Sequence, residues 1–378
     1  MTITDSPVQS VVEQVIAPAA VEIDRTGAFP RAGIDALGRA GALGIMSAAE
    51  VGGSGRGLRA AAEVIETIAA ACGSTAMVVL MHYAAVPVLE AHGPREVREA
   101  IARGQHLTTL AFSEVGSRSH FWAPEGTALL SDGHVRLDAH KSWVTSAGQA
   151  DSYVWSSQPV SATAGFTLWL VAATAAGLSQ TGSFDGLGLR GNSSTPVTAV
   201  GLEIPASAML GEDGAGLDIA MSLVLPNFLV LSAAFSVGLM EATAGETARH
   251  LTQTRLTHLN QTLAQQQSVR LDFARLRIEI DRTRALLEDT LAALESGRAD
   301  AMLRVLEVKA AAAEAALEVT DLAMKVCGGA AFRKELGIER RFRDARAARV
   351  MAPTTDALPD FVGRATLGLP LLEDVVAR

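Results

Sequence analysis

The hydrophobic periodicity changes twice along the 378-residue chain, and these two changes constrain the fold most strongly. Up to about residue 107, apolar residues recur at three- and four-residue spacing, which is typical of amphipathic helices. From 108 to 216 the apolar runs are short and are separated by Gly, Ser and Asp, which predicts strands at about 107–112, 134–137, 153–156, 166–172 and 197–204. From 217 to the end the helical spacing returns, including a long apolar stripe typical of a bundle helix. The sequence therefore predicts an α+β protein with a helical domain (1–107), a central β domain (108–216) and a C-terminal helical domain (217–378).

Composition narrows the class of protein further. The chain is 49% hydrophobic but only 4% aromatic, so a large core of Ala, Leu and Val is expected. The net charge of −9, without a long basic block, argues against nucleic acid as a partner. Cys72 and Cys327 are too few and too far apart for a disulfide framework, which favours a reducing compartment.

Neither a signal peptide nor a membrane span is expected from the sequence. The N-terminus lacks a basic region followed by an apolar one, and the most apolar stretch, Thr75 to Leu89, is shorter than a membrane span. The histidines show no metal-ligand spacing, so no metal site is expected. We expect a cytoplasmic protein that is not embedded in a membrane.

A proline-marked corner lies near the C-terminus. The basic helical run that begins at Arg340 should end near Met351, because Pro353 disfavours helical conformation in the preceding residue and lacks an N–H. A second short helix should follow. The basic residues between Arg333 and Arg349 are expected to form a solvated helix face or a subunit contact, with phosphate contact as the alternative.

This corner resembles the C-terminal signature of the acyl-CoA dehydrogenase family. Arg343-Asp344 and Arg364 fall in register with that signature. In most of the family a glutamate at the corner removes a proton alpha to the thioester carbonyl, and its position here is Ala352. One subgroup places its base elsewhere, at the position of Phe228. Neither base position therefore carries a carboxylate.

The resemblance also assigns the corner residues Thr354 and Asp356 to the cofactor site. Asp356 is expected to cap or pair rather than to act as the base. More broadly, the resemblance implies an N-terminal helical domain, a central β-barrel or sandwich and a C-terminal four-helix bundle.

The first half of the β domain carries two motifs that match the family's flavin-binding motifs. In the run from 113 to 120, the flavin-contacting hydroxyl maps to Ser113 and the phosphate-side serine to Ser119. In the run from 141 to 146, the resemblance gives Trp143 the role of covering the flavin and Thr145 that of reaching its N5 edge. His120 replaces a family aspartate and is a candidate catalytic residue, since imidazole exchanges protons near neutral pH. The alternative is that His120 only hydrogen-bonds a loop carbonyl.

A third motif, Gly186 to Gly191, has the spelling of a dinucleotide-binding G-x-G-x-x-G. A helix should follow such a motif, whereas residues 192–200 are rich in Ser, Thr and Val and indicate a loop and a strand. We therefore reject a Rossmann interpretation of this run.

The C-terminal half keeps part of the family's cofactor contacts. Gln267 matches a glutamine that reaches a neighbouring subunit's cofactor, and Gly328 and Gly329 match a double glycine. Arg255 lies one residue out of register with the family arginine, and Lys325 replaces a glutamine while keeping a donor for pyrophosphate. The resemblance implies a homotetramer or homodimer that binds FAD.

Three functions remain open from the sequence. The first is an FAD-dependent dehydrogenase of an acyl thioester or a related small molecule, with an electron-transfer flavoprotein as partner and without the usual glutamate. The second is a monooxygenase that uses reduced FMN or FAD from a flavin reductase together with oxygen. The third is a non-catalytic partner subunit of a heteromeric dehydrogenase. The substrate and its carrier, whether CoA, a carrier protein or none, are not determined by the sequence.

Overall fold

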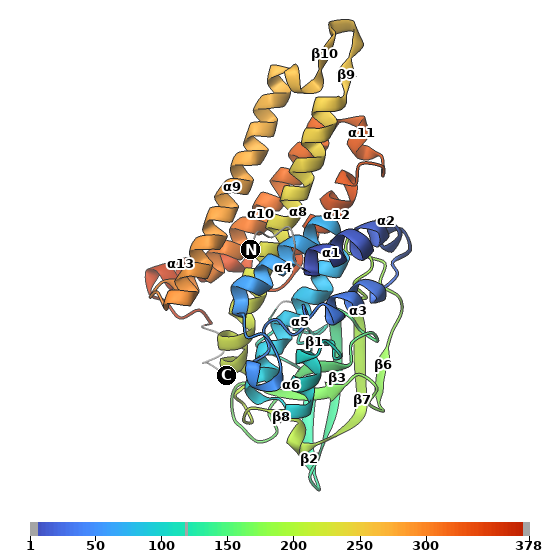
Figure 1. Ribbon diagram of the computed structural model, residues 1–378. Helices are drawn as coiled ribbons and strands as arrows, with labels where there is room; N and C mark the ends of the chain where they lie inside the picture. The colour runs from blue at the N-terminus through green and yellow to red at the C-terminus, as the bar shows by residue number, and fades with distance from the viewer. Residues whose placement is uncertain (1–6, 118–119, 373–378) are drawn as a thin grey trace.

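The computed structural model describes residues 7–117 and 120–372, and its helices and strands occupy three successive regions of the chain. Figure 1 shows the long helices of the bundle above, the N-terminal helices in the middle and the two sheets below. This arrangement confirms the predicted α+β fold class. The N-terminal helices are α1 (Pro7–Val11), α2 (Ala17–Thr26), α3 (Arg31–Arg39), α4 (Gly57–Ala71), α5 (Gly73–His92) and α6 (Arg95–Ala102).

Helix α5 runs through the core. It extends to His92 and is therefore longer than the apolar stretch recognised in the sequence. Helix α5 and the continuous helical segment Gly216–Gln253 are long and apolar enough to cross a membrane by length and composition alone. However, 78% and 89% of their apolar windows are buried inside the protein. Within the described ranges, both are thus core helices of this fold.

His82 connects α5 to its two neighbours. Its Nε2 donates to the Leu43 carbonyl at 3.1 Å, and its Nδ1 accepts from the Thr108 N–H at 3.2 Å. Both ring nitrogens are thereby satisfied only in the neutral imidazole. Burial lowers the pKa of His82 to about 4, which keeps the ring neutral at physiological pH. His82 is therefore a packed core residue that fixes the start of the first strand.

The β domain consists of two four-stranded sheets. One sheet has the order β1-β4-β5-β8, with β1 and β4 parallel and the other pairs antiparallel. The other is antiparallel, in the order β2-β3-β7-β6. The strands are β1 (Thr108–Ala111), β2 (Thr127–Ser131), β3 (His134–Val144), β4 (Ser152–Ser157), β5 (Thr167–Ala172), β6 (Leu178–Gln180), β7 (Thr195–Pro205) and β8 (Met209–Leu210).

Burial explains which strands the sequence predicted. Strand β3 alternates between exposed and buried residues, and β4 is buried along its whole length, so both carry a clear hydrophobic pattern. Strands β2, β6 and β8 were missed, because β2 is mostly exposed and the other two are very short. Strand β7 begins at Thr195, where a Rossmann motif would have required a helix, so the rejection of that motif is confirmed.

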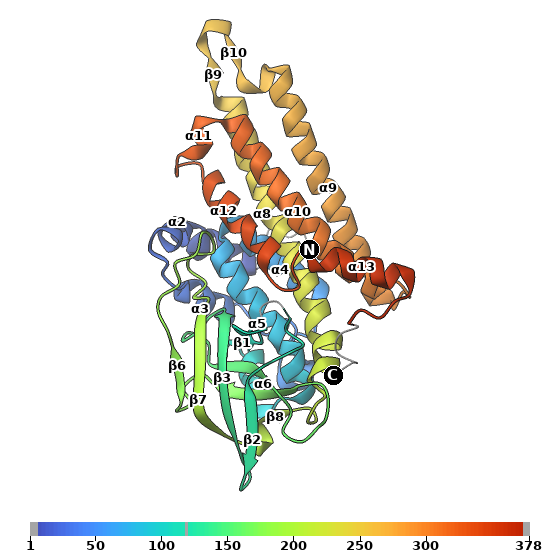
Figure 2. The same ribbon diagram turned by 180° about the vertical axis from the view of Figure 1, so that it is seen from behind.

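The C-terminal region is a helical bundle that Figure 2 shows from behind. A short hairpin of β9 (Arg255–Leu256) and β10 (Gln261–Thr262) projects from the end of the bundle farthest from the sheets (Figure 1). The helices are α7 (Gly216–Ile219), α8 (Leu225–Gln253), α9 (Gln267–Ser296), α10 (Ala301–Cys327), α11 (Gly329–Phe332), α12 (Ile338–Val350) and α13 (Ala357–Leu367).

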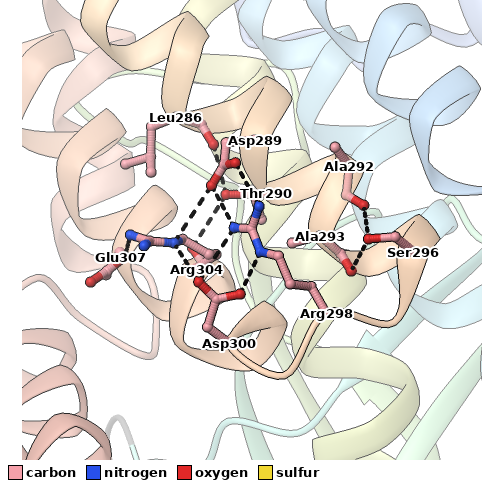
Figure 3. A network of polar contacts seen from close by, with 10 residues as sticks. All are labelled: Leu286, Asp289, Thr290, Ala292, Ala293, Ser296, Arg298, Asp300, Arg304 and Glu307. Carbon is pink, nitrogen blue, oxygen red and sulfur yellow. Dashed lines mark hydrogen bonds and ion pairs between the residues drawn. The ribbon is translucent and has the colours of Figure 1, made fainter.

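A polar network closes the turn between α9 and α10 (Figure 3). Arg298 donates to both carboxylate oxygens of Asp289 at 2.8 and 2.7 Å and to Asp300 at 2.5 Å. Arg304 donates to Asp300 at 3.1 Å and to Glu307 at 2.7 Å. Because the side chains of Arg298, Asp289 and Asp300 are 34–44% exposed, solvent screens the network, which fixes the turn but adds little free energy of unfolding.

The basic helix α12 is not a solvated face. Arg340 and Arg341 donate to the carbonyls of Ala71 and Ala70 at the end of α4, and Arg343 forms an ion pair with Asp24 at 2.6 Å. The prediction of a solvated face is therefore wrong for these three arginines. The guanidinium groups of Arg340 and Arg341 bind carbonyls of the last turn of α4, where a helix lacks intrahelical partners.

Candidate active site

A cavity of about 1060 Å³ lies where the β domain, helix α5 and the C-terminal helices meet. Ligand pockets for cofactors and small molecules commonly have volumes on the order of 300–1,000 Å³. The predicted site residues that line the cavity are Ser113, His120, Trp143, Thr145, Ala352, Thr354 and Asp356. Ser119 lies outside the described residues. The cavity thus brings two motifs of the β domain and the C-terminal corner into one site.

Trp143 is held in the cavity wall by an irregularity of β3. The pairing of β3 with β7 shifts register between Lys141 and Val144, and Trp143 has a φ of 55°. A bulge of this kind redirects a side chain away from the sheet, and positive φ at a bulky residue persists only where the surroundings impose it. The indole remains 71% exposed. An apolar ring displayed in a cavity is suited to contact with a planar ligand.

Hydroxyl groups lie beside this indole. Thr145 is buried, and its Oγ1 lies 2.9 Å from Ser194 Oγ, another cavity residue. Two hydroxyls in contact use one proton between them, which leaves the other proton for a ligand. Ser113 lies two residues after the end of β1, and its carbonyl accepts from the Ser142 N–H at 2.8 Å. The cavity that Trp143 lines therefore also offers a hydroxyl donor.

A buried ion pair supports this wall from behind. Lys141 Nζ donates to Glu114 Oε1 at 2.5 Å and to the carbonyl and hydroxyl oxygens of Ser156 at 2.6 and 2.8 Å. Glu114 Oε2 accepts from the N–H groups of Glu125 and Gly126 at 2.7 and 2.9 Å. Because all these partners are satisfied, Glu114 lines the cavity without being free to act as a base. Burial lowers the pKa of Lys141 to about 8, opposed by the Glu114 carboxylate.

The corner at Ala352 lies between helices α12 and α13. Helix α12 ends at Val350, so the predicted helix end near Met351 is confirmed, and Ala352-Pro353 is a cis peptide bond. Ala352 and Phe228 both line the cavity. Neither family base position therefore presents a carboxylate to it.

The predicted cap at the start of α13 comes from a different residue. Asp356 lies at the N-cap position, but its side chain makes no capping hydrogen bond. Instead, Thr354 Oγ1 accepts from the Ala357 N–H at 3.3 Å. Within residues 7–117 and 120–372, Asp356 also forms no ion pair. The prediction that Asp356 caps or pairs is therefore wrong; Asp356 is an exposed residue that lines the cavity.

His120 makes the loop-carbonyl contact that was the alternative for it, and its catalytic role stays a prediction. Its Nδ1 lies 3.1 Å from the Ser117 carbonyl oxygen, which can only accept, so the ring nitrogen carries the proton there. In the neutral ring, Nε2 is then an acceptor. The imidazole stacks edge-on against Trp122, with 5.0 Å between ring centroids, and lines the cavity. His120 is therefore oriented by the loop carbonyl and leaves Nε2 as a hydrogen-bond acceptor.

The remaining predicted cofactor residues do not line this cavity. Arg255 is in β9, and Gln267 begins α9. Lys325 is in the last turn of α10, Gly328 follows that helix, and Gly329 begins α11. Figure 1 places these elements at the end of the bundle with the hairpin. Lys325 forms an ion pair with Asp272 at 2.7 Å, and a Cβ at either glycine would meet nothing within 4 Å. This end of the bundle is an open surface.

Several cavity features escaped the sequence reading. The run from Gly186 to Leu189 lines the cavity, and Gly188 packs so closely that a Cβ would lie 2.6 Å from the Arg343 backbone. The glycines of this run could have identified it in the sequence as a place of close backbone packing rather than of phosphate binding. Met77, Met81 and Phe112 form an apolar part of the wall. No group of three or more His, Cys, Asp or Glu residues within the described ranges could hold a metal ion.

The residues present fit a flavin. The volume accommodates a tricyclic ring, the exposed Trp143 offers a flat apolar face, and Thr145 with Ser194 offers a hydroxyl proton at its edge. Bound beside these groups, a flavin would cover apolar surface that the cavity otherwise leaves exposed. The redox chemistry would come from the flavin, because these side chains supply none.

Comparison with known proteins places the chain in a family. Residues 4–104 match the family model "Acyl-CoA dehydrogenase, N-terminal domain", and residues 214–367 match "Acyl-CoA dehydrogenase, C-terminal domain". Among its relatives, cyclohex-1-ene-1-carbonyl-CoA dehydrogenase of Geobacter metallireducens is 26% identical over 95% of this chain and 96% of its own. The mitochondrial short-chain specific acyl-CoA dehydrogenase of Homo sapiens is 27% identical over 91% of this chain and 84% of its own.

The fold comparison agrees. The structure of butyryl-CoA dehydrogenase from Megasphaera elsdenii superposes with a TM-score of 0.90, at 21% identity, covering 97% of this chain and 99% of that one. The order of helices and strands, the cavity at their junction and both family models lead to the same assignment. The chain belongs to the acyl-CoA dehydrogenase family.

Proposed function

We propose that this member of the family is an FAD-dependent oxidoreductase that acts on an acyl thioester or a related small molecule without a glutamate at the corner. The observation that carries the proposal is the single cavity shared by Trp143, Thr145 and the corner at Ala352. Within the family, these positions serve the flavin and the reacting carbon. The bound flavin would supply the acceptor for a hydride or, when reduced, the reaction with oxygen.

Different side chains of the cavity would contact the flavin, the acyl group and the exchanged proton. Trp143 would cover one face of the flavin ring, and the hydroxyl pair of Thr145 and Ser194 would donate at its edge. The apolar wall that includes Met81 and Phe228 suits an aliphatic or alicyclic acyl group and excludes water from it. His120 is the cavity residue best placed to exchange a proton, since its Nε2 accepts while Nδ1 is held by Ser117.

A second candidate function is monooxygenation with reduced FMN or FAD from a separate reductase. It is favoured by the absence of a carboxylate at Ala352 and Phe228, the two base positions that line the cavity. It needs no base for a proton alpha to a thioester, whereas the dehydrogenase reaction does. A non-catalytic subunit is the weakest candidate, because the exposed Trp143 and the hydroxyl pair of Thr145 are kept together.

Replacing Trp143 with alanine is expected to weaken flavin binding about 2- to 10-fold, because an aromatic contact contributes roughly 0.5–1.5 kcal/mol beyond burial. Flavin fluorescence quenching during titration measures this affinity, and Val200→Ala, at an exposed apolar position on β7, is the control. If the wild-type protein binds neither FAD nor FMN in either redox state, the proposed function is wrong.

We also propose that the protein assembles as a homotetramer or homodimer in which a neighbouring copy completes the cofactor site. Support comes from Gln267, Lys325 and Gly328, which lie at the open end of the bundle rather than at the cavity of their own chain. Light scattering at micromolar concentration should give the mass of an oligomer. A monomer that binds FAD with full affinity would contradict this prediction.

An electron-transfer flavoprotein in the first function, or a flavin reductase in the second, would be the redox partner.

A cytoplasmic location is part of the proposal and is supported by Cys72 and Cys327, which are both free and buried.

A further inference from the structure

Lys309 lies directly behind the corner at Ala352. It is on α10, its exposed fraction is 1%, and its Nζ donates to the carbonyl oxygens of Met351 at 2.9 Å and Pro353 at 2.6 Å. Across the described part of the chain, no carboxylate forms an ion pair with it. A buried ammonium without an anion is costly, and here two backbone carbonyls are the groups that stabilise it.

The contacts of Lys309 with the two carbonyls also determine the direction of the N–H groups in the same peptide units. In a trans peptide unit the carbonyl and the following N–H point in opposite directions. The Met351–Ala352 and Pro353–Thr354 bonds are both trans. Because Lys309 draws the two carbonyls toward the core, the N–H groups of Ala352 and Thr354 point the other way, toward the cavity that both residues line.

These two N–H groups are available to a ligand. Among the hydrogen bonds of the described residues, neither the Ala352 N–H nor the Thr354 N–H has an acceptor. Backbone donors that lie ready at a cavity stabilise an oxygen on which negative charge resides or develops. A cation bonded to the carbonyl end of each peptide polarises the N–H at its other end.

Resting on the proposed function, we propose that Lys309 is a positioning residue that fixes and polarises the Ala352 and Thr354 N–H groups for the carbonyl oxygen of an acyl thioester. Lys309 itself does not touch the ligand. Burial, which lowers the pKa of Lys309 to about 7, is consistent with an amine held by dipoles rather than by a counter-ion. The specificity would be for a ligand oxygen, because an acyl chain alone gives the two donors nothing to bind.

The test compares two ligands that differ in that oxygen. Butyryl-CoA carries the thioester carbonyl, whereas the thioether S-butyl-CoA has the same chain without it. For the wild-type flavoprotein we expect butyryl-CoA to bind about 10-fold more tightly than S-butyl-CoA, as hydrogen bonds of ordinary net strength imply. Lys309→Met should reduce this ratio to about 1 to 3 while leaving the affinity for S-butyl-CoA unchanged. Calorimetry and perturbation of the flavin spectrum measure both affinities.

Controls separate a positioning role from a loss of folding. Lys334→Met, at an exposed lysine, should keep the wild-type ratio. If Lys309→Met does not fold, Lys309→Gln provides the measurement, since its amide can still donate but carries no charge, and its ratio should also fall. A Lys309 variant that folds and keeps the wild-type preference overturns the proposal, as does a wild-type protein that binds both ligands equally. A wild type that binds flavin but neither ligand instead contradicts the acyl-thioester function.

Discussion

Glu114→Ala is expected to destabilise the protein by about 3–5 kcal/mol, because it leaves the ammonium of Lys141 buried without its anion. Lys141 is fully buried and Glu114 is 3% exposed, so water cannot replace the lost partner. The free energy of unfolding from a urea titration measures the change. The cavity wall should loosen as well, since these residues directly adjoin Ser113 and Ser142, whose backbones are hydrogen-bonded to each other.

Two further variants show whether the loss of stability in Glu114→Ala comes from the unpaired charge of Lys141. The double variant Glu114→Leu/Lys141→Met should be more stable than Glu114→Ala, because an apolar pair removes both charges from the interior. Arg298→Ala, in the accessible network of Figure 3, should cost less than about 1 kcal/mol and serves as the matched control for an ion pair at the surface. If Glu114→Ala costs no more than Arg298→Ala, the buried pair is not important for stability.

Butyryl-CoA and octanoyl-CoA are expected to reduce the bound flavin about 100- to 10,000-fold more slowly than they would in a relative with the corner glutamate, which is the usual contribution of a general base. The cavity presents Ala352 and Phe228 at the two base positions. Anaerobic stopped-flow absorbance measures the rate, and dithionite reduction of the same sample shows that the flavin itself is reducible. Rapid reduction by either thioester would overturn the prediction.

Restoring the carboxylate alone should recover little of this rate. In Ala352→Glu the neighbouring Pro353 still lacks an N–H and fixes its own φ, so the backbone that aims the new side chain differs from the family's Glu-Gly sequence. A rate that returns to that of the glutamate-containing relatives would contradict this expectation.

Activity measurements on the wild type and on His120→Ala distinguish the two candidate functions. Oxygen-dependent product formation in the presence of a flavin reductase, abolished by His120→Ala but not by His134→Ala, would favour the monooxygenase. His134 is a suitable control because it begins β3 and does not line the cavity. Slow reduction by a substrate thioester that is also abolished by His120→Ala would favour a dehydrogenase in which this imidazole replaces the glutamate.

Features that depend on residues close together in the chain could be predicted from the amino-acid sequence. The periodicity identified the helical and β regions, and Pro353 identified the end of α12, because both are local properties of the chain. The resemblance identified Ser113, Trp143 and the altered corner, all of which line the cavity. Exposed or very short strands such as β2 and β8 were missed, since their side chains carry little burial signal.

Contacts between residues far apart in the chain could not be predicted in this way. The basic run of α12 resembles a solvated face in sequence, yet Arg343 reaches Asp24 and Arg340 reaches the end of α4. Lys309 is an unremarkable lysine in an alanine-rich helix until the corner at Ala352 is packed against it. A lone polar residue in a helical pattern carries no information about its partner, because the partner is set by how helices far apart in the sequence pack together.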